Sequence, residues 1–126
     1  MAHPTDRKYA ATHEWCRADG DTVAIGLTQH AVDQLTDLVY VDLPAPGSAV
    51  TAGSPFGEVE SVKAVSEINA PVSGQVVERN EIVTNDPANI SLDPHGNGWL
   101  IKVKMSDPAE LDALMDAAAY DASLAD

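Results

Sequence analysis

Lys63 is the only basic side chain between Arg17 and Arg79. Acidic residues are spread over the same stretch of chain: Asp19, Asp21, Asp33, Asp37, Asp42, Glu58, Glu60, Glu67 and Glu78. A lysine amine has a pKa of about 10.4 and is protonated at neutral pH, so it becomes an acyl acceptor only with the help of an enzyme. The charge pattern is compatible with a modified lysine and also with an ordinary surface lysine that happens to stand alone.

The residues around Lys63 favour a hairpin. Residues 56–62 and 64–69 are strand-like runs that meet at the lysine, which would lift the amine to the tip of a tight turn. Ser61 and Ala64 are small and leave room for a modifying enzyme. The flanking acids would give a protein partner a charge pattern on which to dock.

Glycine and proline divide the rest of the chain into short pieces, which predicts a mainly β fold. From Thr22 to Leu27, after a turn at residues 19–21, apolar residues alternate with small ones as in a half-buried strand. Thr28 can cap a short helix whose apolar residues are spaced by three and four positions. That apolar face holds Ala31, Val32, Leu35 and Leu38. Further strands are predicted at residues 39–43, 48–50, 56–62, 64–69, 74–78 and 99–103.

A helix is predicted near the C-terminus, over about residues 107–120. Asp107 and Pro108 are typical of an N-cap and a first helical position, and Glu110 stands where a capping glutamate is expected. One apolar face contains Leu111, Leu114, Met115 and Ala118. Because the chain has no low-complexity segment and no linker, we interpret residues 1–126 as a single domain that ends in this helix.

The sequences on either side of the lysine resemble each other. Residues 43–50 and 70–77 both place proline and glycine ahead of β-branched residues, with Lys63 between them. Two similar β-units related by a pseudo-twofold axis would produce this pattern. Chance is the alternative, since proline and glycine turns are common in β proteins.

The composition excludes several kinds of partner. The chain has 126 residues, with 20 acidic and 7 basic side chains and a formal net charge of −13. Nucleic acids and anionic membrane surfaces are bound by clustered Lys and Arg, so neither is expected as a partner. No apolar run is long enough to span a membrane, and the first residues resemble neither a signal peptide nor a transit peptide. With a single cysteine, Cys16, these features predict a cytoplasmic protein.

The sequence lacks the common motifs of enzyme chemistry. The four histidines and Cys16 do not have the spacing of a metal site. There is no Gly-x-Ser-x-Gly nucleophile elbow, and residues 96–98 are too short a glycine segment for a phosphate-binding loop. We therefore expect no catalytic residue and no metal ligand.

The segment around Lys63 resembles the lipoyl-lysine motif of the glycine cleavage system H protein family. The family motif is Glu-Ser-Val-Lys-Ala, which stands here at residues 60–64. Further segments resemble the family in the same order along the chain: residues 12–15, 25–28, 39–44, 66–74 and 93–102. The sequence departs from the family at Thr36, Glu67 and His95, where glycine, aspartate and tyrosine are common.

This resemblance implies a carrier and not an enzyme. The fold would be a mainly β barrel-sandwich hybrid of the lipoyl- and biotinyl-carrier kind, with short helices, and lipoate would be joined to Lys63 by an amide bond. The carrier would shuttle the aminomethyl group of glycine from glycine decarboxylase to aminomethyltransferase and the reduced arm to dihydrolipoyl dehydrogenase. A lipoate-attaching enzyme would modify the lysine, and we expect the carrier to be a monomer.

The resemblance also implies a cleft for the loaded arm, with Thr12, Glu14 and Glu67 in its lining. An amine joined through one carbon to sulfur decomposes when its nitrogen lone pair is available. A carboxylate beside the nitrogen keeps it protonated, and a cleft excludes water. Glu14 is the first candidate for this carboxylate, and the alternative is that Glu14 is a solvated strand residue.

Two other functions remain open. One is a different swinging-arm carrier, although biotin carriers place methionines where Val62 and Ala64 stand, and lipoyl domains of 2-oxo acid dehydrogenases lack the segment at residues 12–15. The other is a binding or structural module in which Lys63 is not modified.

Overall fold

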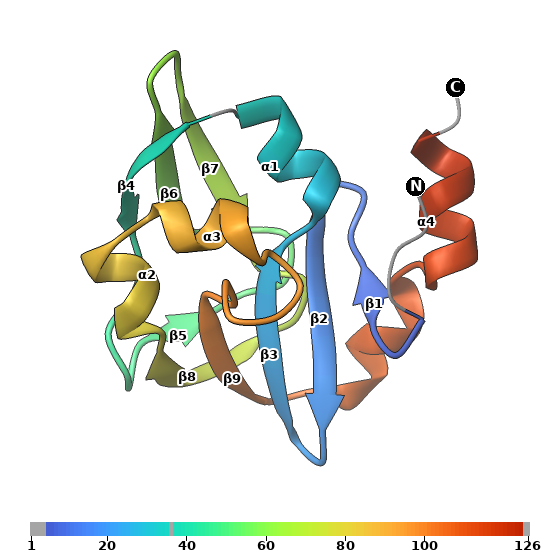
Figure 1. The fold of residues 1–126 in the computed structure, drawn as a ribbon. Helices are drawn as coiled ribbons and strands as arrows, with labels where there is room; N and C mark the ends of the chain where they lie inside the picture. Colours follow the sequence, from blue (N-terminus) through green and yellow to red (C-terminus); the bar gives the residue numbers. More distant parts are fainter. Residues whose placement is uncertain (1–4, 36, 125–126) are drawn as a thin grey trace.

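Strands account for most of the regular structure in the computed structural model, which describes residues 5–35 and 37–124 (Figure 1). One sheet contains β1 (Lys8–Tyr9), β2 (Glu14–Asp19), β3 (Thr22–Leu27), β9 (Ile101–Met105), β8 (Gly74–Arg79) and β5 (Ala49–Val50), in that spatial order. A second sheet contains β4 (Leu38–Asp42), β6 (Pro55–Ser61) and β7 (Val65–Asn69), also in spatial order. The helical segments are α1 (Gln29–Leu35), α2 (Glu81–Asn85), α3 (Ala88–Leu92), a 3₁₀ helix (Pro108–Ala113) and α4 (Ala117–Leu124). All strand pairs are antiparallel, so the prediction of a mainly β, mostly antiparallel fold is confirmed.

The hairpin of β2 and β3 shows how the local sequence forms these strands. Asp19 pairs with Thr22, which leaves Gly20 and Asp21 as a two-residue turn. Gly20 has a φ of 67°, a conformation that glycine adopts without the steric cost that a side chain would add. Beyond the turn, Val23 and Ile25 point into the core on the same face of β3, as the alternation predicted.

The two segments with similar sequences lie next to each other in the fold. Ala49 of β5 pairs with Gln75 of β8, and Val50 pairs with Gly74. The hairpin of β6 and β7 lies between these segments in the sequence, so Lys63 is at the centre of two nested antiparallel pairings. This arrangement agrees with the pseudo-twofold interpretation of the repeat.

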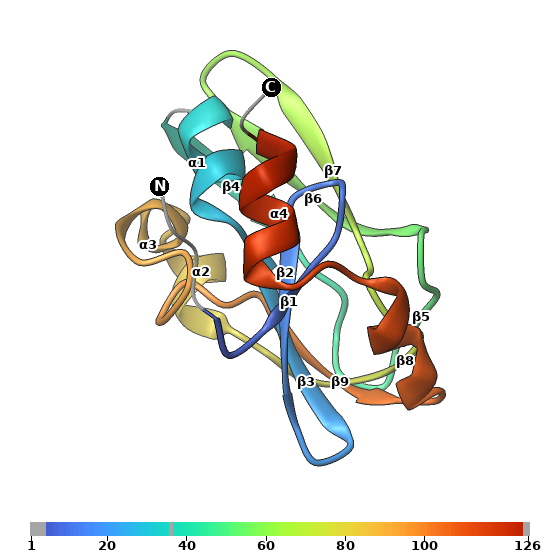
Figure 2. The same cartoon turned by 90° about the vertical axis from the view of Figure 1, so that its right-hand side faces the viewer.

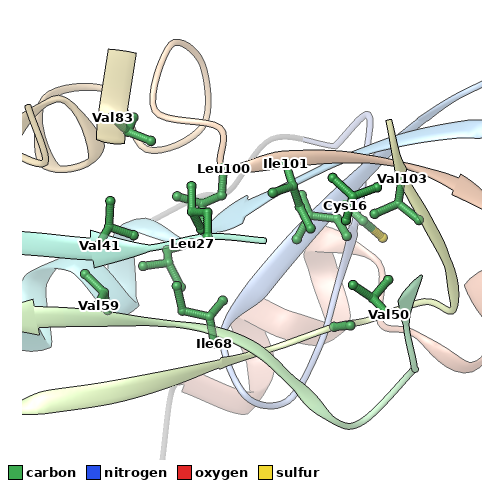
Figure 3. Close-up of a cluster of buried hydrophobic side chains, with 14 of the residues drawn as sticks. Cys16, Leu27, Val41, Val50, Val59, Ile68, Val83, Leu100, Ile101 and Val103 are labelled. Atoms are coloured by element: carbon green, nitrogen blue, oxygen red, sulfur yellow. The ribbon is translucent and has the colours of Figure 1, made fainter. Parts of the chain in front are cut away.

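The main core lies between the two sheets. Its side chains come from both sheets and from the helices, and Figure 3 shows ten of them with labels, including Val59 and Ile68 of the smaller sheet and Ile101 and Val103 of the larger one. These four side chains are fully buried. Burial of apolar surface at about 25 cal/mol per Å² is the main force that holds the sheets together.

A second, smaller cluster lies on the outer face of the larger sheet, where α4 covers β1 and β2 (Figure 2). Its buried members are Tyr9, Trp15, Ala24, Ala117 and Tyr120. The Trp15 indole Nε1–H donates a hydrogen bond to the Pro94 carbonyl oxygen at 2.9 Å. The guanidinium of Arg7 lies 4.6 Å from the Trp15 ring centroid. Trp15 is thus a packing residue.

The first helix is shorter than its apolar spacing predicted. Thr28 does cap it, since its Oγ1 accepts a hydrogen bond from the Ala31 N–H at 3.2 Å. The helix ends at Leu35, however, and Leu38 is the first residue of β4, where it pairs with Ser61. Pairing with β6 satisfies the backbone in this segment, so the chain is extended there. The difference from the family noted at Thr36 lies outside the described residues.

The predicted helix over residues 107–120 is instead two short helices. Asp107 caps the 3₁₀ helix by accepting a hydrogen bond from the Ala109 N–H at 3.2 Å. The chain then becomes extended, and Met115 forms an antiparallel bridge with Tyr9 through hydrogen bonds of 2.8 and 2.9 Å. This bridge satisfies polar groups at the edge of β1, which a continuous helix would leave unpaired. Helix α4 begins only after the bridge.

Glu110 also differs from its predicted role. Its carboxylate does not cap its own helix but accepts hydrogen bonds from the N–H and Oγ–H of Ser73, at 2.7 and 3.0 Å. It thereby joins the 3₁₀ helix to the turn before β8.

None of the helices within the described residues is long and apolar enough to cross a membrane.

Candidate functional site

Lys63 lies at the tip of the β6–β7 hairpin. Glu60 pairs with Val65, so the hairpin closes over residues 61–64. Val62, Lys63 and Ala64 are all exposed, and 67% of Val62 is accessible. The hairpin predicted from sequence is confirmed, and the lysine amine is at the surface.

Ser61 shapes this hairpin from the inside. Its side chain is buried, and its Oγ accepts hydrogen bonds from the N–H groups of Lys63 at 3.3 Å and Ala64 at 3.1 Å. The Ser61 N–H donates to the Ala64 carbonyl oxygen at 2.8 Å, and its hydroxyl lies 3.2 Å from the same oxygen. The Val62 N–H donates to the Asp37 carbonyl oxygen at 3.0 Å. The tip is therefore a fixed turn and not a loose loop.

No ion pair involves the Lys63 ammonium within residues 5–35 and 37–124. The acidic residues around it do not reach the amine. The hairpin thus presents the lysine nitrogen without an ionic partner from the described part of the chain.

A cleft of about 120 Å³ lies between α1, the start of β2 and the β6–β7 hairpin. Its lining residues are Thr12, His13, Glu14, Leu27, Ala31, Gln34, Leu35, Val59, Ser66 and Glu67. Four of these residues are aliphatic, and they give the cleft an apolar wall. The structure therefore brings Thr12, Glu14 and Glu67 together in one cleft. The other residues of the lining were not predicted from the sequence.

Glu14 is the most unusual side chain of this cleft, because only 1% of it is exposed. Its Oε1 accepts a short hydrogen bond from the Thr12 hydroxyl, and its Oε2 accepts one from the Asn69 N–H at 3.2 Å. Burial raises the pKa of the Glu14 carboxyl to about 7, although these hydrogen bonds act in the opposite direction. The alternative of a solvated strand residue is wrong.

The carboxylate of Glu14 lies in a cleft whose described lining has one imidazole, that of His13, and no permanent cation. Among the described residues that line the cleft, none is lysine or arginine. A buried carboxylate is costly without a cation, so the site favours either a proton on Glu14 or a cationic ligand beside it. Glu67, the other acidic residue of the lining, is exposed.

The backbone at His13 directs Glu14 into the cleft. His13 has a φ of 76°, in the left-handed region that non-glycine residues rarely adopt. Its N–H donates to the Ala10 carbonyl oxygen at 3.0 Å, and its carbonyl oxygen accepts from the Thr28 N–H at 3.1 Å. In the sequence, His13 stands out only as part of the segment at residues 12–15 and as one of four histidines. The left-handed backbone conformation of a histidine has no local sequence signal.

Comparisons with known proteins agree with the geometry. Residues 7–126 match the family model described as glycine cleavage H-protein. The chain is 50% identical over 121 residues to a glycine cleavage system H protein of Myxococcus xanthus. The aligned region covers 96% of this chain and 94% of that protein. It is 51% identical over 124 residues to a glycine cleavage system H protein of Acinetobacter baumannii, and the aligned region covers 98% of this chain and 100% of that protein.

A solved structure shows the same fold. The crystal structure of a glycine cleavage system H protein from Mycobacterium marinum superimposes with a TM-score of 0.90 at 44% identity. The match covers 97% of this chain and 98% of that one. The fold is therefore the lipoyl-carrier fold that the sequence resemblance implied, and the chain belongs to the glycine cleavage H-protein family, the non-catalytic lipoyl carriers of the glycine cleavage system.

Proposed function

We propose that Lys63 is the residue that carries lipoate, through an amide bond to its Nζ. The supporting observation is an exposed lysine at the tip of a rigid hairpin, with no ion pair from the described part of the chain. The residues fit the group, because the nearby cleft has an aliphatic wall for a hydrocarbon arm and a carboxylate for a cationic end. Lipoate, when bound, supplies a dithiolane that can be reduced and can carry a group on sulfur.

The cleft is within reach of the lysine. Glu67, on β7, follows Lys63 by four residues, and four residues of extended chain span at most about 13 Å. A lysine side chain extended by lipoate has about a dozen bonds and reaches on the order of 14 Å. The same arm can therefore lie in the cleft or extend away from the protein toward another active site.

Glu14 is proposed to hold the ammonium of the aminomethyl cargo, with Thr12 and Glu67 in supporting positions. The Thr12 hydroxyl and the Asn69 amide fix both oxygens of the carboxylate. An ammonium beside Glu14 would replace the proton that burial otherwise favours, and the carboxylate would in turn keep the nitrogen protonated. Water is excluded at this depth, since Glu14 is almost fully buried.

The partners follow from this assignment. Family membership implies the other enzymes of the glycine cleavage system, and we propose visits to glycine decarboxylase, aminomethyltransferase and dihydrolipoyl dehydrogenase in turn. A lipoate-attaching enzyme would act first on the hairpin tip. The monomeric state and the cytoplasmic location expected from the sequence stay predictions.

Intact-mass spectrometry tests the assignment. The chain is expressed with an active lipoate-attaching enzyme, and we expect one lipoyl adduct that peptide mapping places on Lys63. Lys63→Arg keeps the charge but removes the acceptor, so it should show the bare mass, with an unchanged melting temperature. An adduct on another lysine, or a bare mass while a known substrate is lipoylated in the same cells, would contradict the assignment and favour an unmodified binding module.

A further inference from the structure

We propose that Tyr120, in the C-terminal helix α4, is a positioning residue that locks two walls of the cleft together and so holds Glu14 in place. The proposal rests on the proposed role of the cleft as the site for the loaded arm. It concerns a residue that lies outside the cleft lining and far from Lys63 in sequence.

The Tyr120 hydroxyl lies between two residues that belong to different walls. Its oxygen is 2.7 Å from Nδ1 of His13 and 2.8 Å from Oγ1 of Thr28. His13 precedes Glu14 and is itself part of the lining. Thr28 is the cap of α1, the helix that supplies Ala31, Gln34 and Leu35 to the opposite wall.

These hydrogen bonds can form one directional chain. The Ala31 N–H donates to Oγ1 of Thr28, which leaves the threonine proton free to be donated to Tyr120. The phenol proton can then be donated to Nδ1 of a neutral His13. Burial and the nearby His30 lower the pKa of His13, which favours the neutral imidazole that this chain needs.

The ring of Tyr120 has a separate role, which makes the hydroxyl testable on its own. The ring stacks on Tyr9 with centroids 4.9 Å apart and an interplanar angle of 9°, and it is fully buried in the second cluster, between α4 and the larger sheet. Tyr120→Phe keeps this stacking and removes one oxygen. The substitution therefore removes the hydrogen bonds of the phenol to His13 and Thr28 and keeps the packing of α4.

The consequence for Glu14 follows from the backbone. His13 is in a left-handed conformation that costs energy for a residue with a side chain, so contacts on both sides must maintain it. Thr28 N–H to His13 O is one such contact, at 3.1 Å, and the phenol is the second link between the same two residues. Without the phenol, we expect the segment before Glu14 to open more often and to admit water to the carboxyl.

The test uses the full chain without lipoate, so that it does not depend on modification of Lys63. Hydrogen exchange by NMR reports the amides of Thr28 and Asn69, which bond to His13 and Glu14. In Tyr120→Phe we expect exchange of these two amides to be about three- to tenfold faster, the effect of losing one buried hydrogen bond. The pKa of Glu14, followed by carboxyl ¹³C shifts, should move from about 7 toward its ordinary value.

Tyr40→Phe is the matched control, because Tyr40 is an exposed tyrosine on β4, away from the lining of the cleft. It should leave both readouts at their wild-type values. Equal exchange rates and an equal Glu14 pKa in the two variants would overturn the proposal. A uniform rise in exchange over both sheets would overturn it as well, since Tyr120 would then contribute only to overall stability. Failure of Lys63 to accept lipoate would contradict the proposed function and leave these two readouts unaffected.

Discussion

The backbone N–H of Asn69 donates a hydrogen bond to the Glu14 carboxylate at 3.2 Å, and in doing so it joins β7 of the smaller sheet to β2 of the larger one. The residue proposed to hold the cargo is therefore attached to the strand that continues from the lysine hairpin. Residues of both sheets line the cleft, and this hydrogen bond fixes the position of the carboxylate relative to both of them.

Ionisation of Glu14 should make the stability of the protein depend on pH. The carboxyl has a pKa of about 7 in the folded protein and an ordinary value of 4.5. Between pH 4.5 and about 7, Glu14 is protonated in the folded chain and ionised in the unfolded chain. The contribution of Glu14 to the free energy of unfolding is therefore complete below pH 4.5 and falls as the pH rises toward 7. The loss is on the order of 3 kcal/mol.

Glu14→Gln removes this contribution, because glutamine does not titrate. Urea unfolding of both proteins from about pH 4 to about pH 8 measures the difference between their free energies of unfolding. We expect the variant to gain stability relative to wild type as pH rises. A difference that stays constant over this range would mean that the Glu14 carboxyl titrates normally.

The same substitution should make the loaded carrier less durable. Each unit by which Glu14 raises the pKa of the cargo amine lowers the fraction with a free lone pair about tenfold. The loaded Glu14→Gln carrier should therefore release formaldehyde and ammonia about tenfold faster than the loaded wild-type carrier. Attachment of lipoate to Lys63 should be normal in this variant. Glu67→Gln is the comparison, since Glu67 is exposed and its loss should have a smaller effect. If both variants release cargo at the wild-type rate, neither carboxylate protects it.

Ser61 should matter more for modification than for folding. Loss of its hydroxyl in Ser61→Ala leaves the amides of Lys63 and Ala64 without their acceptor and should cost about 1 kcal/mol of stability. We expect slower lipoate attachment, because the tip is no longer held in one conformation. The initial rate of adduct formation, followed by mass spectrometry, measures this effect. Ser54→Ala, at an exposed serine in another turn, should attach lipoate at the wild-type rate.

The outer face of the smaller sheet should contribute to docking through its acids. Asp42, Glu58 and Glu67 stand directly opposite one another on three adjacent strands. Like charges in this arrangement are destabilising, so Glu58→Gln should stabilise the fold by about 0.5 kcal/mol. If partner enzymes present a basic surface to this face, the same variant should bind them more weakly at low salt.

Salt titration tests whether the acidic surface contributes to docking or only keeps the protein soluble. Affinity for the partner enzymes should fall as ionic strength rises, because the Debye length shrinks to about 8 Å at 0.15 M salt. The difference between wild type and Glu58→Gln should shrink over the same range. Affinities that do not change with salt would indicate that the acidic surface only keeps the protein soluble.

The sequence by itself determined most of the strands, though not β1 and β2, and the position of the lysine. Residues 22–27 alternate in a period of two, and a turn of glycine and aspartate precedes them, so β3 and the turn before it are specified locally. Lys63 stands alone among acids between two strand-like runs, and those runs pair as predicted. Charge and periodicity are properties of neighbouring residues, which is why they can be read without a structure.

Local sequence patterns predicted the wrong helix boundaries where the chain completes the edge of a sheet. The apolar spacing of Leu38 with the residues of α1 predicted a longer helix, and the spacing of Leu114 and Met115 predicted a continuous one at the C-terminus. In both places the chain is extended because it completes a sheet edge, with Leu38 opposite Ser61 and Met115 opposite Tyr9. Helical periodicity describes side chains alone and does not show where backbone groups find partners.

The properties of the cleft were decided only by the tertiary structure. Glu14 is buried among elements that are far apart in the sequence, and this burial raises its pKa. Its carboxylate is also fixed by the N–H of Asn69, 55 residues further along the chain. The lock at His13 depends on Tyr120, 107 residues away. Desolvation and hydrogen bonding act through space, so a carboxylate that looks like one strand residue among many becomes a distinct site only when distant elements close around it.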